Sequence, residues 1–184
     1  MSLMHRSALP PLPRTLPSLS TPRLLLRAFD AKDSADLFAI YGDPLVMRFV
    51  GEPPFPSLAT VAQMLASVER LLAAGESLEW GLVARDSERL IGTCGLHSFA
   101  GDAGLRQAEV GCMLARRHWG EGLMAEALTA LIAYARRLGL ATLVADIEPG
   151  NLPSQRLFER LGFVWQLDGC YRLALGEGIT PDRG

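Results

Sequence analysis

The sequence contains few cysteines and histidines, and their scarcity excludes several classes of protein. Its three cysteines, Cys94, Cys112 and Cys170, are odd in number and form no C-x-x-C pair. The pattern therefore predicts neither a disulfide framework nor a zinc site, and it favours a reducing cytoplasm. The three histidines stand at positions 5, 97 and 118, too dispersed to suggest a metal cluster. We expect no bound metal.

Long apolar runs and an excess of positive charge are also absent. No run approaches the 18 or more apolar residues of a membrane helix. The net charge of -2 and the pI near 5.9 lack the basic excess that a nucleic-acid surface requires. Prolines at positions 10, 11, 13 and 17 interrupt any apolar segment of a secretion signal. We expect a cytoplasmic protein without nucleic-acid or membrane partners.

The length and composition predict one domain with a full core. The chain has 184 residues, of which 49% are hydrophobic, and this is too short for two comfortable domains. We expect a disordered Pro-rich leader over residues 1–20, a domain over residues 21–175 and a C-terminal tail over residues 176–184. No internal repeat is present.

Hydrophobic periodicity and end signals predict alternating strands and helices. Apolar residues at helical spacing predict a helix over residues 123–138, while Asp30 is a suitable N-cap and Gly75 a suitable helix stop. The expected helices span residues 31–41, 60–74, 123–138 and 154–161. The expected strands span residues 23–28, 79–84, 89–99, 107–114 and 141–147, and a hairpin or strand spans residues 163–175. This pattern is typical of an α/β domain.

The segment between the strand at 107–114 and the helix at 123–138 has the features of a phosphate-binding loop. Glycines at positions 120 and 122 allow backbone to approach a ligand closely. The first amides of the following helix have no partner within it, and the helix dipole favours an anion there. Arg116 and Arg117 add positive charge. The loop therefore predicts a pyrophosphate site.

The same loop also fits the dinucleotide-binding fingerprint, because Gly120, Gly122 and Ala125 match G-x-G-x-x-A. Asp146 ends the next apolar run, where a ribose-binding acid would stand. However, that fingerprint places its first glycine directly after a strand, and residues 115–119 intervene here. Only 59 residues follow Ala125, too few for a six-stranded doubly wound sheet. A dinucleotide-linked oxidoreductase is therefore the less favoured interpretation.

A second cluster reads Asn-x-x-Ser at 151–154, followed by Phe-Glu-x-Leu-Gly-Phe at 158–163. With Arg-x-x-Gly-x-Gly at 117–122 and the opening Thr-Pro-Arg-Leu-Leu-Leu-Arg at 21–27, it resembles the GNAT superfamily of acyl-CoA N-acyltransferases. The likeness is strongest to the ribosomal-protein N-terminal (Rim-type) acetyltransferases. The three motifs occur in the family's order over residues 21–173.

The resemblance implies a single GNAT-like α/β domain with a central mixed, mostly antiparallel sheet and a V-shaped splay between two strands. It implies an acetyl-CoA-dependent N-acetyltransferase, monomeric or homodimeric, whose acceptor is a peptide N-terminus or a small-molecule amine. The implied cofactor-binding residues are Cys112, Met113, Leu114, Arg116, Arg117, Trp119, Gly120, Glu121, Gly122, Leu123, Met124, Asn151, Ser154 and Phe158.

Two residues are candidates for proton transfer. Glu109 lies in a strand that leads to the pyrophosphate loop, at a position where the resemblance places a glutamate, and we expect it to act as the base, directly or through water. The family often places a tyrosine where this chain has Phe158. Phenylalanine has no proton to give, so Ser154, one turn upstream, becomes the candidate for contact with the departing sulfur.

Other interpretations of these residues stay open at this stage. Glu109 is also compatible with an exposed strand position, and Asn151 with Pro153 and Ser154 makes a good helix start. Cys112 could be read as an acyl-carrying nucleophile, but no histidine base lies nearby in sequence and a strand cysteine is usually a small core residue. A non-catalytic CoA- or nucleotide-binding module is the alternative to an enzyme.

Overall fold

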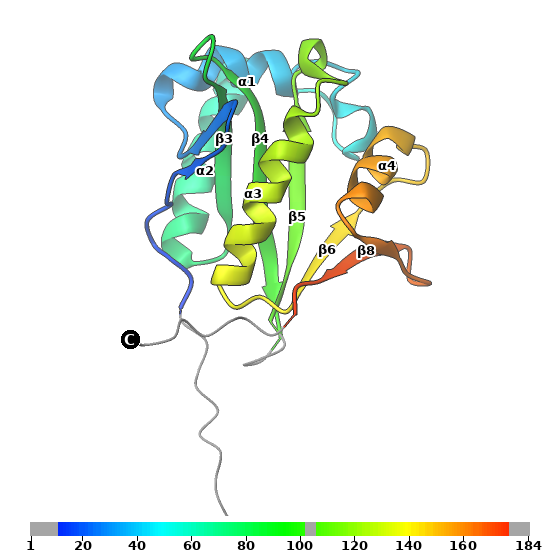
Figure 1. Cartoon of the computed structure of the whole chain (residues 1–184). Coiled ribbons are helices and arrows are strands. Elements are labelled where there is room, and N and C mark those ends of the chain that lie inside the picture. The colour runs from blue at the N-terminus through cyan, green and yellow to red at the C-terminus, as the bar shows by residue number, and fades with distance from the viewer. Residues whose placement is uncertain (1–10, 102–105, 177–184) are drawn as a thin grey trace, which may run out of the picture.

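The computed structural model describes residues 11–101 and 106–176, and these form one layered domain (Figure 1). The helices are α1 (Ser34–Tyr41), α2 (Leu58–Ala74), α3 (Leu123–Arg137) and α4 (Leu152–Arg160), with short 3-10 turns at Ala31–Asp33, Met47–Phe49 and Arg116–His118. The strands are β1 (Leu19–Ser20), β2 (Leu24–Arg27), β3 (Leu78–Ala84), β4 (Leu90–Ala100), β5 (Gln107–Leu114), β6 (Thr142–Asp146), β7 (Val164–Trp165) and β8 (Cys170–Ala174).

The eight described strands form one sheet in the order β1-β2-β3-β4-β5-β6-β8-β7. All neighbouring pairs are antiparallel except β5 and β6, which are parallel. Helix α3 covers one face of the sheet, and α1 and α2 lie on the other (Figure 1). The expected α/β class with a mixed, mostly antiparallel sheet is confirmed. No helix among the described residues is both long and apolar enough to cross a membrane.

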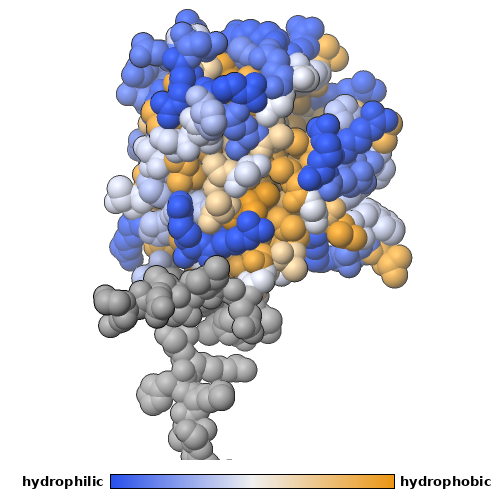
Figure 2. All heavy atoms as spheres, in the orientation of Figure 1, coloured by the Kyte–Doolittle hydropathy of each residue, from blue (hydrophilic) through white to orange (hydrophobic). Residues whose placement is uncertain are grey.

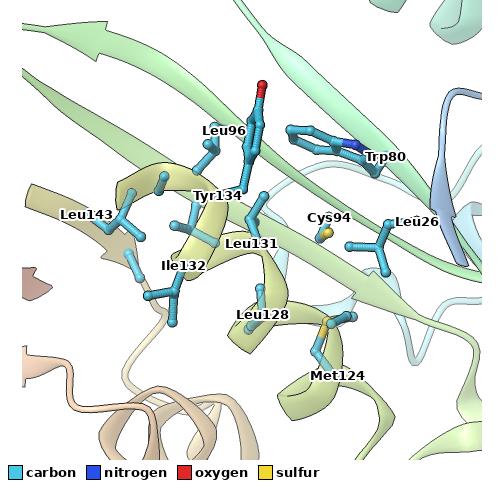
Figure 3. Packing of buried hydrophobic residues seen from close by; sticks show 14 of the residues in the cluster. Leu26, Trp80, Cys94, Leu96, Met124, Leu128, Leu131, Ile132, Tyr134 and Leu143 are labelled. Atoms are coloured by element: carbon cyan, nitrogen blue, oxygen red, sulfur yellow. The ribbon is translucent and has the colours of Figure 1, made fainter. Parts of the chain in front are cut away.

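The main core lies between α3 and the sheet (Figure 3). The buried side of α3 presents Ala127, Leu128, Leu131, Ile132 and Ala135, the helical spacing that the sequence predicts. The rings of Trp80 on β3 and Tyr134 on α3 meet edge to face, with centroids 5.5 Å apart. This packing fixes α3, and therefore the loop before it, against the sheet.

Part of the expected leader belongs to the fold. Leu19 is buried in the main core, and β1 pairs with β2. The indole Nε1 of Trp80 donates a hydrogen bond of 2.7 Å to the carbonyl of Pro17. This finding differs from the expectation of a disordered leader over residues 1–20. Residues 1–10 and the tail from 177 to 184 lie outside the described residues.

The helix-end signals in the sequence act as expected. Asp30 caps the turn that leads into α1, because its carboxylate accepts a hydrogen bond of 3.0 Å from the amide of Lys32. The Asp33 carboxylate in turn accepts a hydrogen bond from the amide of Asp30. Gly75 ends α2 in the left-handed conformation, with φ +73°. Both helix ends could be predicted from the sequence, because a cap is a contact between residues that are close along the chain.

The parallel pair β5 and β6 opens after three residues. Their register joins Gln107, Ala108 and Glu109 to Thr142, Leu143 and Val144. Beyond Glu109, the rest of β5 has no partner on β6, although it stays paired with β4 as far as Leu114. In Figure 1, β6 leans away from β5 toward α4. This divergence is the V-shaped splay that the resemblance implies.

Candidate active site

The loop between β5 and α3 is built around two glycines in left-handed conformations. Gly120 has φ +80° and Gly122 has φ +76°, a region that side chains with a Cβ adopt only with strain. Gly122 is the N-cap of α3, and the first helical bond runs from the amide of Glu126 to the carbonyl of Gly122. The amides before Glu126 are therefore available to an anion.

The two arginines of the loop have partners that the sequence did not suggest. Arg116 Nε lies 3.1 Å from a carboxylate oxygen of Asp43, the residue after α1 and Gly42. Arg117 Nε donates to the ring of His118 at 3.1 Å. Both side chains still contribute positive charge at the loop. Because both guanidinium groups already have partners, the backbone amides at the start of α3 are the preformed part of an anion site.

Trp119 connects the loop to the end of β5. Its indole Nε1 donates a hydrogen bond of 2.8 Å to the carbonyl of Leu114, while about half of the residue remains exposed. Glu121 contributes its backbone carbonyl, which accepts from Arg23 Nη1 at 2.9 Å. Leu123 and Met124, the first residues of α3, are buried in the core. The loop is therefore fixed at both ends.

Sequence analysis missed the residue that anchors the start of α3. Glu126 accepts from the hydroxyl of Thr21 at 2.6 Å and forms a 2.7 Å ion pair with Arg23 Nε. It also accepts from the backbone amide of Arg23. Thr21 and Arg23 belong to the opening motif quoted above, so that motif is explained in part by its contact with α3. The only sequence signal for Glu126 was an acidic residue in the first helical turn.

An apolar surface lies at the opening beside β5. Cys112, Met113 and Leu114 follow the end of the β5–β6 ladder and are half-buried. Figure 2 shows apolar atoms gathered between α3 and α4, bordered by hydrophilic ones. Burial raises the pKa of the Cys112 thiol to about 12, so the thiolate is scarce near neutral pH. This environment disfavours Cys112 as a nucleophile.

Helix α4 begins on the far side of the opening, directly after β6. The side-chain oxygen of Asn151 accepts from the amide of Ser154 at 3.3 Å, so Asn151 caps the helix as its alternative interpretation proposed. The Ser154 hydroxyl makes no hydrogen bond to any described residue and is half-buried. Phe158 is buried and packs edge to face on Phe163, with centroids 5.0 Å apart.

Glu109 stands at the point where the two strands part. Its Cα pairs with His97 on β4 and with Val144 on β6, and Val144 is the last residue of the ladder. The side chain is half-buried. The structure thus places Glu109 at the closed end of the opening, on the same strand as the apolar residues 112–114.

The dinucleotide interpretation fails on the architecture. The strand before the loop ends at Leu114, and a 3-10 turn at Arg116–His118 separates it from Gly120. The sheet is mostly antiparallel, whereas a dinucleotide-binding fold requires a parallel, doubly wound sheet. No group of three or more His, Cys, Asp or Glu among the described residues is placed to hold a metal ion.

The described residues thus form a mixed sheet that splays next to a glycine-containing loop at a helix N-terminus. The acetyltransferase (GNAT) domain model matches residues 23–164, and the chain therefore belongs to the GNAT acetyltransferase family. Enzymes of this family use acetyl-CoA as the acetyl donor.

Known proteins similar to this chain agree with that assignment. The chain is 32% identical over 156 residues to p20 of Bacillus licheniformis, an uncharacterized N-acetyltransferase, covering 84% of this chain and 85% of p20. It is 31% identical over 166 residues to the uncharacterized N-acetyltransferase YoaA of Bacillus subtilis, covering 90% of this chain and 92% of YoaA. The fold also matches RimL, a ribosomal L7/L12 α-N-protein acetyltransferase solved in complex with coenzyme A. The TM-score is 0.75 at 17% sequence identity, and the match covers 86% of this chain and 98% of the RimL chain.

Proposed function

We propose that this chain is an acetyl-CoA-dependent N-acetyltransferase in which an amine attacks the thioester directly. The observation that carries the proposal is the junction of two features on one strand. β5 leaves β6 at Glu109, and the same strand leads through Leu114 into the Gly120–Gly122 loop. An extended thioester cofactor could lie in the opening with its pyrophosphate at the start of α3. We propose a cytoplasmic enzyme, monomeric or homodimeric.

The cofactor would be held mainly by backbone and apolar contacts. The amides from Gly120 to Met124 would bind the pyrophosphate, with Arg116 and Arg117 adding charge. The half-buried residues 112–114 would contact the pantetheine arm. Because Phe158 is buried against Phe163, it would form part of the α4 side of the opening.

The acceptor would be an amine, and its protonation state sets the chemical problem. An alkyl ammonium has a pKa of about 10.4 and a peptide α-amine about 8, so either must lose a proton before it can attack near pH 7. Glu109, at the closed end of the opening, is the proposed base, directly or through water. A peptide α-amine needs less help than a lysine-like amine, which favours a protein N-terminus or a small amine of low pKa.

The first test measures cofactor and product together. We expect acetyl-CoA and CoA to raise the melting temperature, because they bind only the folded loop, while NAD and NADH leave it unchanged. We also expect free thiol to be released from acetyl-CoA in the presence of a panel of peptide and small-molecule amines. Stabilisation without thiol release across the panel would instead support a non-catalytic CoA-binding module.

The departing thiolate provides a further prediction on α4. Ser154 and Phe158 are one turn apart on the same helix, and the Ser154 hydroxyl is free to contact sulfur. We expect Ser154→Ala to lower kcat by roughly 10-fold. The effect is modest because a thiol of pKa about 8.5 can depart as thiolate without a proton donor, and because one hydrogen bond contributes about 1 kcal/mol. We expect Phe158→Tyr to retain or raise kcat. Wild-type kcat in Ser154→Ala together with an inactive Phe158→Tyr would show that this helix does not handle the sulfur.

A further inference from the structure

A row of three aligned residues crosses β3, β4 and β5 beside the opening. The register aligns Glu79 on β3 with Gly95 on β4, and Gly95 with Gly111 on β5. Gly111 lies two residues beyond Glu109, where β5 has no β6 partner. The two glycines carry no side chains, so side chains from neighbouring positions can lie over this part of the sheet. With strands about 4.8 Å apart, this row spans two strand spacings.

The carboxylate of Glu79 lies over Gly95. It occupies the space that a Cβ on Gly95 would fill, so the side chain extends across β4 toward Gly111. Ser77 donates a hydrogen bond of 2.8 Å to Glu79 Oε1. No lysine or arginine among the described residues forms an ion pair with it. Glu79 is therefore a carboxylate with one hydrogen-bond donor and no cation.

His97 covers the other end of the row. Its Nε2 lies 3.3 Å from the position of a Cβ on Gly111. The β4–β5 register shifts between His97 and Ala100, and Ser98 has φ +51°, unusual for a residue with a side chain. The Ser98 hydroxyl is 3.0 Å from His97 Nδ1. Such irregularities redirect side chains near active sites, and this one accompanies an imidazole held over Gly111.

Glu79 and His97 line one cavity of about 560 Å³, with Leu71, Ser77, Ser98 and Phe99 among the other lining residues. Burial raises the pKa of the Glu79 carboxyl to about 7, against a lowering by the Ser77 hydrogen bond. The titratable groups around it are Glu76 in the cavity, His97, the half-buried Tyr41 from α1 and Cys94 from β4. None of these supplies a permanent positive charge.

The chemistry of N-acetylation requires a proton acceptor near the amine. A primary ammonium has three N–H bonds and the secondary amide product has one, so two protons leave the nitrogen. The departing thiolate takes back one of them, and the other must pass to the enzyme and then to solvent. An acceptor whose pKa is close to the working pH performs this transfer best.

We propose that Glu79 binds the ammonium group of a primary-amine acceptor in the cavity that it lines with His97, and that it takes the first proton of that group. This inference rests on the proposed function and divides the role of the base between two carboxylates, with Glu79 taking the proton lost before attack and Glu109 the proton lost during it. The ammonium N–H bond breaks and the proton passes to Glu79, while the electron pair stays on nitrogen. The nitrogen then forms the N–C bond as the C–S bond breaks. Its second proton leaves by way of Glu109, the thiolate is protonated, and Glu79 returns its proton to solvent through the cavity.

The test compares Glu79→Gln with the matched control Glu69→Gln, an exposed glutamate on α2. The readout is kcat/KM between pH 6 and pH 10, with acetyl-CoA and the best primary amine of the panel. We expect the wild type and Glu69→Gln to show an ascending limb with a pKa near 7. We expect Glu79→Gln to lose that limb, to be about 10²-fold slower at pH 7 and to recover as pH approaches the pKa of the free amine.

The outcomes separate the two proposals. An active wild type with an equally active Glu79→Gln overturns the role of Glu79 and leaves the proposed function intact. A wild type that releases no thiol with any amine overturns the proposed function, and with it this inference. A pH-independent loss in Glu79→Gln, with a lower melting temperature or weaker CoA binding, would indicate a structural role only. If Glu79→Gln does not fold, Glu79→Asp carries the test and should keep the limb near pH 7 at a reduced rate.

Discussion

We expect Gly122→Val to remove binding of acetyl-CoA and CoA while the protein remains folded. Gly122 is the N-cap of α3 with φ +76°, and an added Cβ would meet only Arg23 Nη2, at 3.7 Å. The protein itself therefore leaves space for the side chain. The branched side chain would instead occupy the region where a phosphate approaches the helix amides. Because hydrogen bonds to charged groups contribute about 1.5–3 kcal/mol each, we expect affinity to fall by about 10²-fold or more.

The matched control for this prediction is Gly75→Val. Gly75 also has a left-handed backbone, with φ +73° and no atom within 4 Å of an added Cβ, but it ends α2 instead of starting α3. Both variants incur a similar strain of about 1–2 kcal/mol from the left-handed conformation. Isothermal titration with CoA should therefore show lost affinity only in Gly122→Val. Undiminished affinity in a folded Gly122→Val protein would contradict the placement of the phosphate.

Elements set by local signals were predictable from the sequence. The periodicity of residues 123–138 predicts a helix with one buried face, and α3 buries that face. The turn around Asp86, Ser87 and Glu88 joins β3 and β4 in an antiparallel hairpin. These predictions depend on contacts between neighbours in the chain. Errors at such element ends were limited to one to three residues: α2 starts two residues earlier than expected, and α1 starts three residues later, after a 3-10 turn.

The leader shows why some of the fold could not be predicted. Its prolines indicate an irregular chain, but Pro17 and Leu19 contact Trp80 and the main core, about 60 residues away. A short edge strand of two residues has no periodicity to detect. Its stability comes from burial of Leu19 and from pairing with β2, both of which depend on tertiary structure.

In the candidate site, the sequence predicts the loop and the β5 positions, but not the row of residues that crosses β3 and β4. Gly120 and Gly122 could be identified because a phosphate loop is continuous in sequence. The Glu79–Gly95–Gly111 row joins three strands, and its existence depends on two strand registers. Glu79 in the sequence is one ordinary glutamate beside Trp80. Only the strand register shows that Gly95 and Gly111 lie beside it in the sheet, and that the absence of a side chain on Gly95 leaves room for its carboxylate.

The largest kinetic effect at the opening is expected from Glu109→Gln. Glu109 is the last β5 residue paired with β6, so its side chain stands where an amine and a thioester in the opening would meet. If it receives the proton that nitrogen loses during attack, an amide at this position should lower kcat by about 10²-fold or more near neutral pH. Binding of CoA should be unchanged, because the pyrophosphate loop is not altered. Activity should recover at higher pH, as free amine and hydroxide become available.

The pH profiles of the two glutamate variants should differ, since the two carboxyls take different protons. Glu109→Gln should keep the ascending limb near pH 7 that Glu79→Gln loses, because burial raises the Glu79 pKa to about 7 and that group is intact in Glu109→Gln. The measurement is kcat/KM against pH for both variants and for Glu69→Gln. Wild-type kcat at pH 7 in Glu109→Gln would show that this glutamate only occupies the strand end. In that case Glu79, two strands away on β3, would be the single carboxylate that removes protons from the amine.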